Sequence, residues 1–164
     1  MTIKILSSQE INSFYAFFEK LMKENFGFYQ EKVINHFLTK IYTRENLKYW
    51  IKNNYRIILT ADDEKNYLGF AMIDAPYGGV SLLRFLAVDK THQKKGVGKA
   101  LILKWEEIAK NQDCHKLEVA AYPLVEGFYK KCGFVSEGLR KNSYFGINQV
   151  IMGKVIGQFD SEKL

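Results

Sequence analysis

The 164-residue sequence has few cysteines, histidines and prolines: two, three and two, respectively. The two cysteines, Cys114 and Cys132, match neither the spacing of a metal site nor a disulfide framework. Three scattered histidines also supply no metal-binding cluster. We therefore expect no metal ion, reduced thiols and a cytoplasmic location.

The sequence also lacks long hydrophobic runs, repeats and linker-like segments. No run approaches the roughly 18 apolar residues of a membrane-spanning helix, and the start, Met1–Leu6, becomes polar too soon for a secretory signal. Hydrophobic residues make up 47% and charged residues 26% of the chain, a globular composition. These features predict one domain, residues 1–164, and no membrane association.

The net charge of +6 is moderate, and the lysines are scattered along the chain. The stretch Lys48–Arg56 interleaves aromatic and basic residues, as nucleic-acid-binding surfaces do. However, Leu47, Trp50 and Ile51 recur at helical spacing, which favours a helix face packed against a core. A nucleic-acid partner is therefore not expected.

Hydrophobic periodicity predicts the element order β-α-α-α-β-β-β-α-β-α-β-β. Strands are expected at 3–6, 55–61, 67–74, 80–88, 116–121, 133–139 and 149–156; helices are expected at 11–25, 33–41, 43–53, 96–111 and 123–131. Polar turns at 62–66 and 76–79 predict an antiparallel meander, and the helical crossover after 80–88 predicts a parallel strand pair. The predicted fold class is α+β, with one mixed, mostly antiparallel sheet flanked by helices.

A glycine-containing loop lies between the strand ending at Val88 and the helix that follows. It reads Gln93-Lys94-Lys95-Gly96-Val97-Gly98, and its lysines and helix N-terminus suit a pyrophosphate. A dinucleotide-binding fold would need a third glycine, which is absent. A P-loop would need Ser or Thr where the chain has Ala100.

The loop belongs to a pair of ordered motifs that resembles the GNAT acetyltransferase superfamily. Leu86-Ala87-Val88, followed by the loop, is similar to the acetyl-CoA signature of that family, Q/R-x-x-G-x-G/A. About 30 residues later, Phe128-Tyr129 followed by Gly133-Phe134 resembles the family's second motif. The resemblance covers a core of about 55–156 and implies a GNAT acyl-CoA N-acyltransferase fold with the N-terminal helices on the substrate side.

The resemblance implies acetyl-CoA as cosubstrate. Strands 80–88 and 116–121 would splay apart, helped by a β-bulge, and main-chain groups of Leu86 and Val88 would bind pantetheine. The loop would bind the pyrophosphate, which Gly96 and Gly98 would allow to approach the backbone. The implied binding residues are Leu86, Ala87, Val88, Gln93, Lys94, Lys95, Gly96, Val97, Gly98 and Lys99.

The resemblance also assigns the chemistry. Tyr129 matches the tyrosine that protonates the leaving thiolate, and Glu118 resembles a glutamate that acts as base through water in one branch of the family. The Glu118–Tyr129 spacing is one residue shorter than in that branch, so deprotonation of the amine by bulk water remains an alternative, and Asp74 and Asp89 are weaker rivals. The alternative interpretations are a core tyrosine and a surface glutamate on an alternating strand.

Two further expectations concern Cys132 and Tyr122. We do not expect Cys132 to act as a nucleophile, because no histidine is near it in the sequence. Tyr122 occupies a position where the family often has asparagine, which weakens the transfer of the base role to Glu118.

The acceptor is less constrained by the sequence. Aromatic residues in the first two helices and the last hairpin, namely Phe26, Phe28, Tyr29, Tyr144 and Phe145, could shape a pocket for an apolar or cationic amine, or form core or dimer contacts. Tyr144, Phe145 and Ile147 make a homodimer possible. The positive net charge disfavours a polycationic acceptor.

The sequence therefore predicts an N-acetyltransferase that moves acetyl from acetyl-CoA to a primary amine by direct attack in a ternary complex. The acceptor would be a small molecule or a protein N-terminus. The alternatives are a non-catalytic acyl-CoA-binding regulatory module and a tRNA-directed acetyltransferase toxin.

Overall fold

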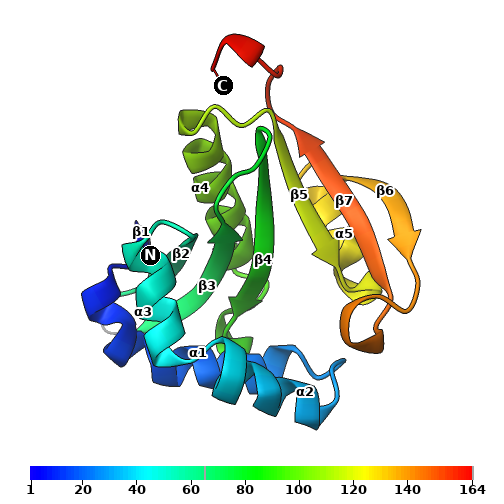
Figure 1. The fold of residues 1–164 in the computed structure, drawn as a ribbon. Coiled ribbons are helices and arrows are strands. Elements are labelled where there is room, and N and C mark those ends of the chain that lie inside the picture. Colours follow the sequence, from blue (N-terminus) through cyan, green and yellow to red (C-terminus); the bar gives the residue numbers. More distant parts are fainter. Residues whose placement is uncertain (65, 164) are drawn as a thin grey trace.

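A computed structural model describes residues 1–64 and 66–163, and within them one mixed sheet of seven strands runs through the molecule (Figure 1). The strands lie in the order β1-β2-β3-β4-β5-β7-β6, and all neighbours are antiparallel except β4 and β5. This confirms the predicted α+β class, the meander and the parallel pair. The bounds are β1 Thr2–Ile5, β2 Arg56–Asp62, β3 Tyr67–Asp74, β4 Val80–Val88, β5 Lys116–Ala121, β6 Val135–Arg140 and β7 Gln149–Val155.

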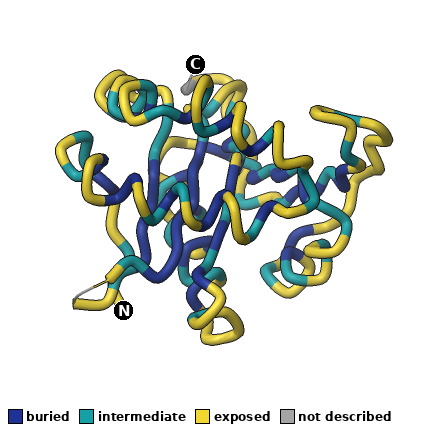
Figure 2. The backbone as a smooth tube through the Cα atoms, turned by 90° about the horizontal axis from the view of Figure 1, so that it is seen from below, coloured by how far each residue is buried: buried dark blue, intermediate teal, exposed yellow. Residues whose placement is uncertain are grey.

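Helices cover both faces of the sheet and enclose two hydrophobic cores. One core packs α4 and α5 against the sheet around Trp105, and the other packs α1 and its neighbours around Phe14 and Phe18. Figure 2 shows the buried strands between more exposed helices and loops. The bounds are α1 Ile11–Asn25, α2 Glu31–His36, α3 Arg44–Lys52, α4 Val97–Asn111 and α5 Glu126–Lys131. As predicted, Leu47 of α3 is buried, with Trp50 and Ile51 packed beside it.

The predicted helix at 33–41 is two segments, α2 and a π-helical turn at Phe37–Ile41. The N–H of Tyr42 donates to the carbonyl of Phe37, five residues earlier, at 2.6 Å. This wider turn lets both rings enter the α1 core, where their centroids lie 5.6 Å apart. Periodicity of apolar residues indicates helix but does not reveal such a change of pitch.

Other boundaries also differ from the predictions. Pro123–Val125 forms a 3₁₀ turn, so α5 begins only at Glu126. Gly133, at φ +89°, ends this helix in a left-handed conformation, and β6 begins two residues later than expected. The predicted turn at 62–66 includes Lys65, which lies outside the described residues; beside it, the N–H of Asn66 donates to Asp63 Oδ1 at 2.7 Å.

A bulge in β4 separates the two halves of the sheet. Met72 pairs with Phe85 but Ile73 pairs with Leu83, so Arg84 is an extra residue in β4. The pairing of β4 with β5 is limited to Val80–Leu83, and the two strands then diverge, as Figure 1 shows. The extra residue also switches the faces of the strand, because Leu83 lies in the α4 core and Phe85 in the α1 core. The splay and bulge match the expectation from the sequence.

Candidate active site

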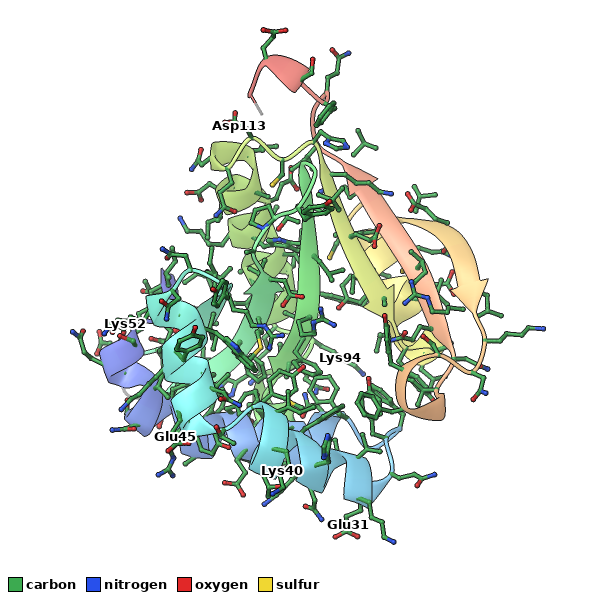
Figure 3. All side chains as sticks on the ribbon, in the orientation of Figure 1. Glu31, Lys40, Glu45, Lys52, Lys94 and Asp113 are labelled. Carbon is green, nitrogen blue, oxygen red and sulfur yellow. The ribbon has the colours of Figure 1, made fainter. Side chains whose placement is uncertain are left out.

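A cavity of about 1110 Å³ occupies the space between the diverging strands. Its walls are residues of β4, β5 and α5, the loop before α4, the α1–α2 loop and the β6–β7 loop. In Figure 3, Lys94 is labelled at the opening between β4 and β5, and it is one of the cavity residues. The volume slightly exceeds the usual range for small-molecule sites, so the cavity has room for a large ligand.

The loop before α4 forms a positively charged end of this cavity. Lys94 and Gly96 both adopt left-handed conformations, with φ of +59° and +84°. The first helical hydrogen bond runs from the N–H of Ala100 to the carbonyl of Gly96 at 3.0 Å, so the N–H groups of 97–99 precede the helical ladder. Lys90, His92, Lys94 and Lys99 also line the cavity. Free N–H groups and cations together favour an anion here.

The two glycines of the loop are needed for different structural reasons. Gly96 needs its positive φ, and a Cβ placed on it would meet nothing within 4 Å. A Cβ on Gly98 would lie 3.1 Å from Cζ of Phe128, so the absence of a side chain here lets α4 and α5 approach each other. The sequence suggested the approach of a phosphate, or a simple turn, for Gly98, and the structure adds this packing contact.

The last part of β4 offers backbone groups to the cavity. The N–H of Asp89 donates to the carbonyl of Leu68 at 2.9 Å, toward β3. Because alternate residues direct their backbone groups to opposite sides, those of Val88 and Leu86 point away from β3. The Val88 carbonyl already accepts hydrogen bonds from Asn25 Nδ2 at 2.8 Å and Gln93 Nε2 at 3.2 Å.

The sequence-predicted binding residues do not all face the cavity. Leu86, Val88, Gln93, Lys94, Gly96, Val97, Gly98 and Lys99 line it. Ala87 does not, because its side chain lies in the α1 core with 3% exposure. Lys95 is exposed and is also not among the lining residues.

Tyr129 belongs both to the core and to the cavity wall. Its ring packs against Phe128 and Phe134, with centroids at 5.1 and 5.6 Å, and its exposure is 6%. It lines the cavity from α5. Burial raises the pKa of the phenol above its ordinary value of 10.0. The hydroxyl therefore remains protonated at neutral pH and is able to donate a proton.

Glu118 reaches the same cavity from β5. Its neighbours Leu117 and Val119 point into the α4 core, so strand alternation places Glu118 on the other face. The side chain is 33% exposed, and Oε2 lies 3.8 Å from Lys116 Nζ. The structure thus brings Glu118 and Tyr129 together in the wall of one cavity.

The rival carboxylates are engaged elsewhere and are not among the lining residues. Asp89 accepts a hydrogen bond from Lys20 Nζ at 2.5 Å, and the bonds from Lys20 and Thr91 hold its pKa well below its ordinary value. Asp74 lies between Arg56 and Arg84. Both are poorly placed to accept a proton from a molecule in the cavity.

Cys132 is also outside the cavity lining. Burial, the larger effect, raises the pKa of its thiol, although Lys154 and Lys99 act in the opposite direction. The thiol therefore stays largely protonated at neutral pH, which does not favour a nucleophilic role.

Aromatic side chains form the other end of the cavity. Phe28 stacks on Tyr122, with ring centroids 4.1 Å apart and an interplanar angle of 6°. Phe145, at φ +58° in the β6–β7 loop, packs edge-on against Phe37 at 4.8 Å. The loop therefore packs against the N-terminal helices. Arg84 and Arg140 also line the cavity.

Sequence reasoning missed Arg84, and it assigned no individual role to Asn25 or Arg140, although their segments, 25–37 and 140–147, were expected to contact the acceptor. A usable signal existed for Arg84, the one charge within the apolar run Leu82–Val88. No comparable signal existed for Asn25, because its contact with Val88 joins segments 63 residues apart.

The described part of the chain has neither a metal-binding cluster nor a membrane-spanning helix. No group of three or more His, Cys, Asp or Glu side chains is arranged to hold a metal ion. None of the helices there combines the length and apolar character needed to cross a bilayer.

Comparison with known proteins gives the family of the chain. The model of the acetyltransferase (GNAT) family matches residues 14–134. The chain belongs to the GNAT acetyltransferase family. This GNAT chain is 31% identical over 68 residues to glucosamine 6-phosphate N-acetyltransferase 1 of Oryza sativa subsp. japonica, a match over 42% of this chain and 41% of that protein. The alignment thus spans about two fifths of that relative.

Solved structures show the same fold over nearly the whole GNAT chain. PaiA N-acetyltransferase from Thermoplasma acidophilum, crystallised with coenzyme A, has a TM-score of 0.76 at 22% identity, covering 95% of this chain and 100% of that one. A GNAT-family acetyltransferase from Streptococcus pneumoniae has a TM-score of 0.78 at 20% identity, covering 95% and 99%. These likenesses establish the GNAT fold.

Proposed function

We propose that this GNAT protein transfers the acetyl group of acetyl-CoA to a primary amine by direct attack in a ternary complex. The observation that carries the proposal is the set of groups that line the cavity between β4 and β5. It combines a lysine-flanked helix start, unpaired strand backbone, a buried tyrosine and a half-buried glutamate.

The cavity suits acetyl-CoA in its chemistry. The N–H groups of 97–99 and the side chains of Lys94 and Lys99 would bind the pyrophosphate. The backbone of Leu86 and the N–H of Val88 would bind pantetheine amides, in the manner of an added strand. The carbonyl of Val88 is already held by Asn25 and Gln93, so in this proposal those two amides stiffen the strand edge.

The transfer needs a proton donor and a proton acceptor. The neutral amine attacks the carbonyl carbon of the thioester, the C–S bond breaks, and the thiolate takes the proton of the Tyr129 phenol. The proton lost by the amine passes to Glu118 through water or directly to bulk water. The phenol of Tyr129 is protonated at neutral pH and so has a proton to donate, and the phenolate that remains after the transfer is reprotonated by solvent.

The free thiols of Cys114 and Cys132 support a cytoplasmic location as part of the proposal. The acceptor is a small amine or a protein N-terminus. Amino sugars belong in a test panel, because the curated relative from Oryza sativa is named for glucosamine 6-phosphate.

The test is a screen of amines in which release of the coenzyme A thiol is followed, together with calorimetry of coenzyme A binding. The proposal predicts binding of coenzyme A and amine-dependent thiol release with at least one amine. Tight binding without transfer to any peptide, polyamine or amino sugar would instead indicate a non-catalytic binding module. Modification of aminoacyl-tRNA alone would indicate a toxin.

A further inference from the structure

The β4 bulge places Arg84 next to the proposed reaction centre. Leu82 pairs with Glu118 and Leu83 with Val119, and Arg84 is the first β4 residue beyond this pairing. It follows Leu82 by two residues, a distance of about 7 Å along a strand. Arg84 and Glu118 both line the cavity. A molecule with its amine near Glu118 would therefore have the Arg84 guanidinium within reach of its other end.

The charge of Arg84 is only partly neutralised by its protein partner. Asp74 is shared, because Arg56 Nε lies 3.0 Å from Oδ1 while Arg84 donates to Oδ2. Two guanidinium groups and one carboxylate leave a net positive charge behind the cavity wall. Among the described residues, the hydrogen bonds of Arg84 come from Nε and Nη2 and go to Asp74, which leaves three of its five N–H donors for a ligand. Its side chain is 35% exposed.

The surroundings of Arg84 add hydrogen-bond donors and a second cation. Arg84 interacts electrostatically with Tyr29, Tyr42 and Tyr144, which come from three different segments. The guanidinium of Arg140 lies 5.7 Å from the ring centroid of Tyr144, and Arg140 also lines the cavity. Two carboxylates, Glu24 and Glu118, are among the described lining residues, and the proposed mechanism uses one of them as base.

We infer that the acceptor amine carries an anionic group, a phosphate or a carboxylate, that Arg84 and Arg140 bind at the aromatic end of the cavity. This inference rests on the proposed acetyltransfer. Guanidinium groups bind both anions through paired N–H donors, and the phenols supply further donors. A polyamine would need carboxylates at this end, where the chain instead has two arginines.

Matched pairs of amines test the inference. D-glucosamine 6-phosphate is compared with D-glucosamine for the phosphate, L-phenylalanine with phenethylamine for the carboxylate, and spermidine serves as the polycation. We expect at least one anionic member to exceed its neutral partner in kcat/KM by about tenfold or more, the effect of one charge-assisted hydrogen bond or more. The pair that shows the preference identifies the anion.

Variants of the two arginines test whether these residues cause the preference for the anionic amine. Arg140→Ala and Arg84→Gln should each reduce the ratio of anionic to neutral kcat/KM about tenfold through a higher KM for the anionic member. Lys141→Ala is the matched control, because Lys141 is an exposed cation beside Arg140 that is not among the cavity residues. It should leave the ratio unchanged. Coenzyme A affinity and the melting temperature show whether each variant is folded.

Binding without turnover separates this inference from the proposed function. Calorimetry on protein saturated with coenzyme A should show tighter binding of the anionic member than of its neutral partner. Transfer to neutral amines or spermidine with equal or better kcat/KM than to both anionic members would overturn the inference and leave the proposed function intact. Absence of both coenzyme A binding and transfer would overturn the two together.

Discussion

Tyr129 is at once a core side chain and a proposed proton donor. It is packed between Phe128 and Phe134 as a core side chain, yet it lines the cavity. Burial in an apolar environment penalises the phenolate and keeps the proton on the oxygen. The same packing fixes the ring, so that the hydroxyl position does not depend on a flexible loop.

Replacing Tyr129 with Phe removes the hydroxyl and little else. Because the thiolate then lacks its proton donor, kcat should fall about 100-fold, within the range for loss of a general acid. The affinity for coenzyme A should be unchanged, since the phenol takes no part in holding the pyrophosphate. Steady-state thiol release and calorimetry measure the two quantities. Unaltered kcat would remove Tyr129 from the mechanism.

The ionised carboxylate of Asp89 stabilises the end of β4 through its hydrogen bonds. Its pKa is lowered in the folded protein mainly by the hydrogen bonds from Lys20 and Thr91. A carboxyl whose folded pKa is below the unfolded value stabilises the protein above the unfolded pKa, near 3.8, and loses that contribution as pH falls further.

Asp89→Asn should therefore lower the free energy of unfolding by about 1–2 kcal/mol at neutral pH. The difference from the unsubstituted protein should shrink as pH is lowered below 3.8. Urea unfolding at several pH values measures it. Glu107→Gln, at a carboxylate whose side chain is 58% exposed, is the control and should change little. A constant difference at all pH values would contradict the explanation.

Among the secondary-structure elements, α4 and α5 meet one residue away from Tyr129. Gly98 on α4 touches Phe128 on α5, the residue before Tyr129. Gly127, also on α5, has open space where a side chain would begin, because a Cβ placed on it would meet nothing within 4 Å. A glycine of α4 and a glycine of α5 therefore differ in whether they tolerate a methyl group.

Gly98→Ala should destabilise the protein by about 1–2 kcal/mol and lower kcat, because the new methyl group pushes Phe128 and α5 away from α4. Gly127→Ala is the matched control and should raise stability slightly, by about 0.5 kcal/mol, because alanine favours helix. Thermal unfolding and thiol release on both variants provide the comparison. Equal stability of the two variants would contradict the proposed contact.

Local sequence patterns predicted most helices and strands. The features that they did not predict depend on contacts between segments distant in the sequence. The meander, the parallel pair and the loop before α4 follow from periodicity and turn residues in segments of about ten residues. The position of Arg84 depends on a bulge, which arises only when β4 pairs with β3.

Several contacts at the site were unpredictable for the same physical reason. The Asn25 contact with Val88 and the Phe145 contact with Phe37 join the N-terminal helices to segments more than 60 residues away. The π-helical turn at Phe37–Ile41 likewise follows from the packing of two rings into the α1 core. Single-sequence periodicity contains no information on these encounters.

At the scale of the whole molecule, the net charge of +6 and the cations around the α4 loop should favour the phosphates of coenzyme A. Attraction between exposed charges is screened within about 8–10 Å at physiological salt. Raising sodium chloride from about 0.05 M to about 0.5 M should therefore weaken coenzyme A binding several-fold. Acetyl-pantetheine, which lacks the pyrophosphate, is the control ligand, and its affinity should not respond. Equal salt dependence for both ligands would place the anion contact elsewhere.

The decisive measurement is a crystal structure of the protein with coenzyme A. We expect the pyrophosphate on the N–H groups of 97–99, with the pantetheine arm between β4 and β5, along Leu86 and Val88, and its sulfur near Tyr129. Coenzyme A bound outside this cavity, or a cavity filled by the protein's own side chains in the complex, would contradict this expectation.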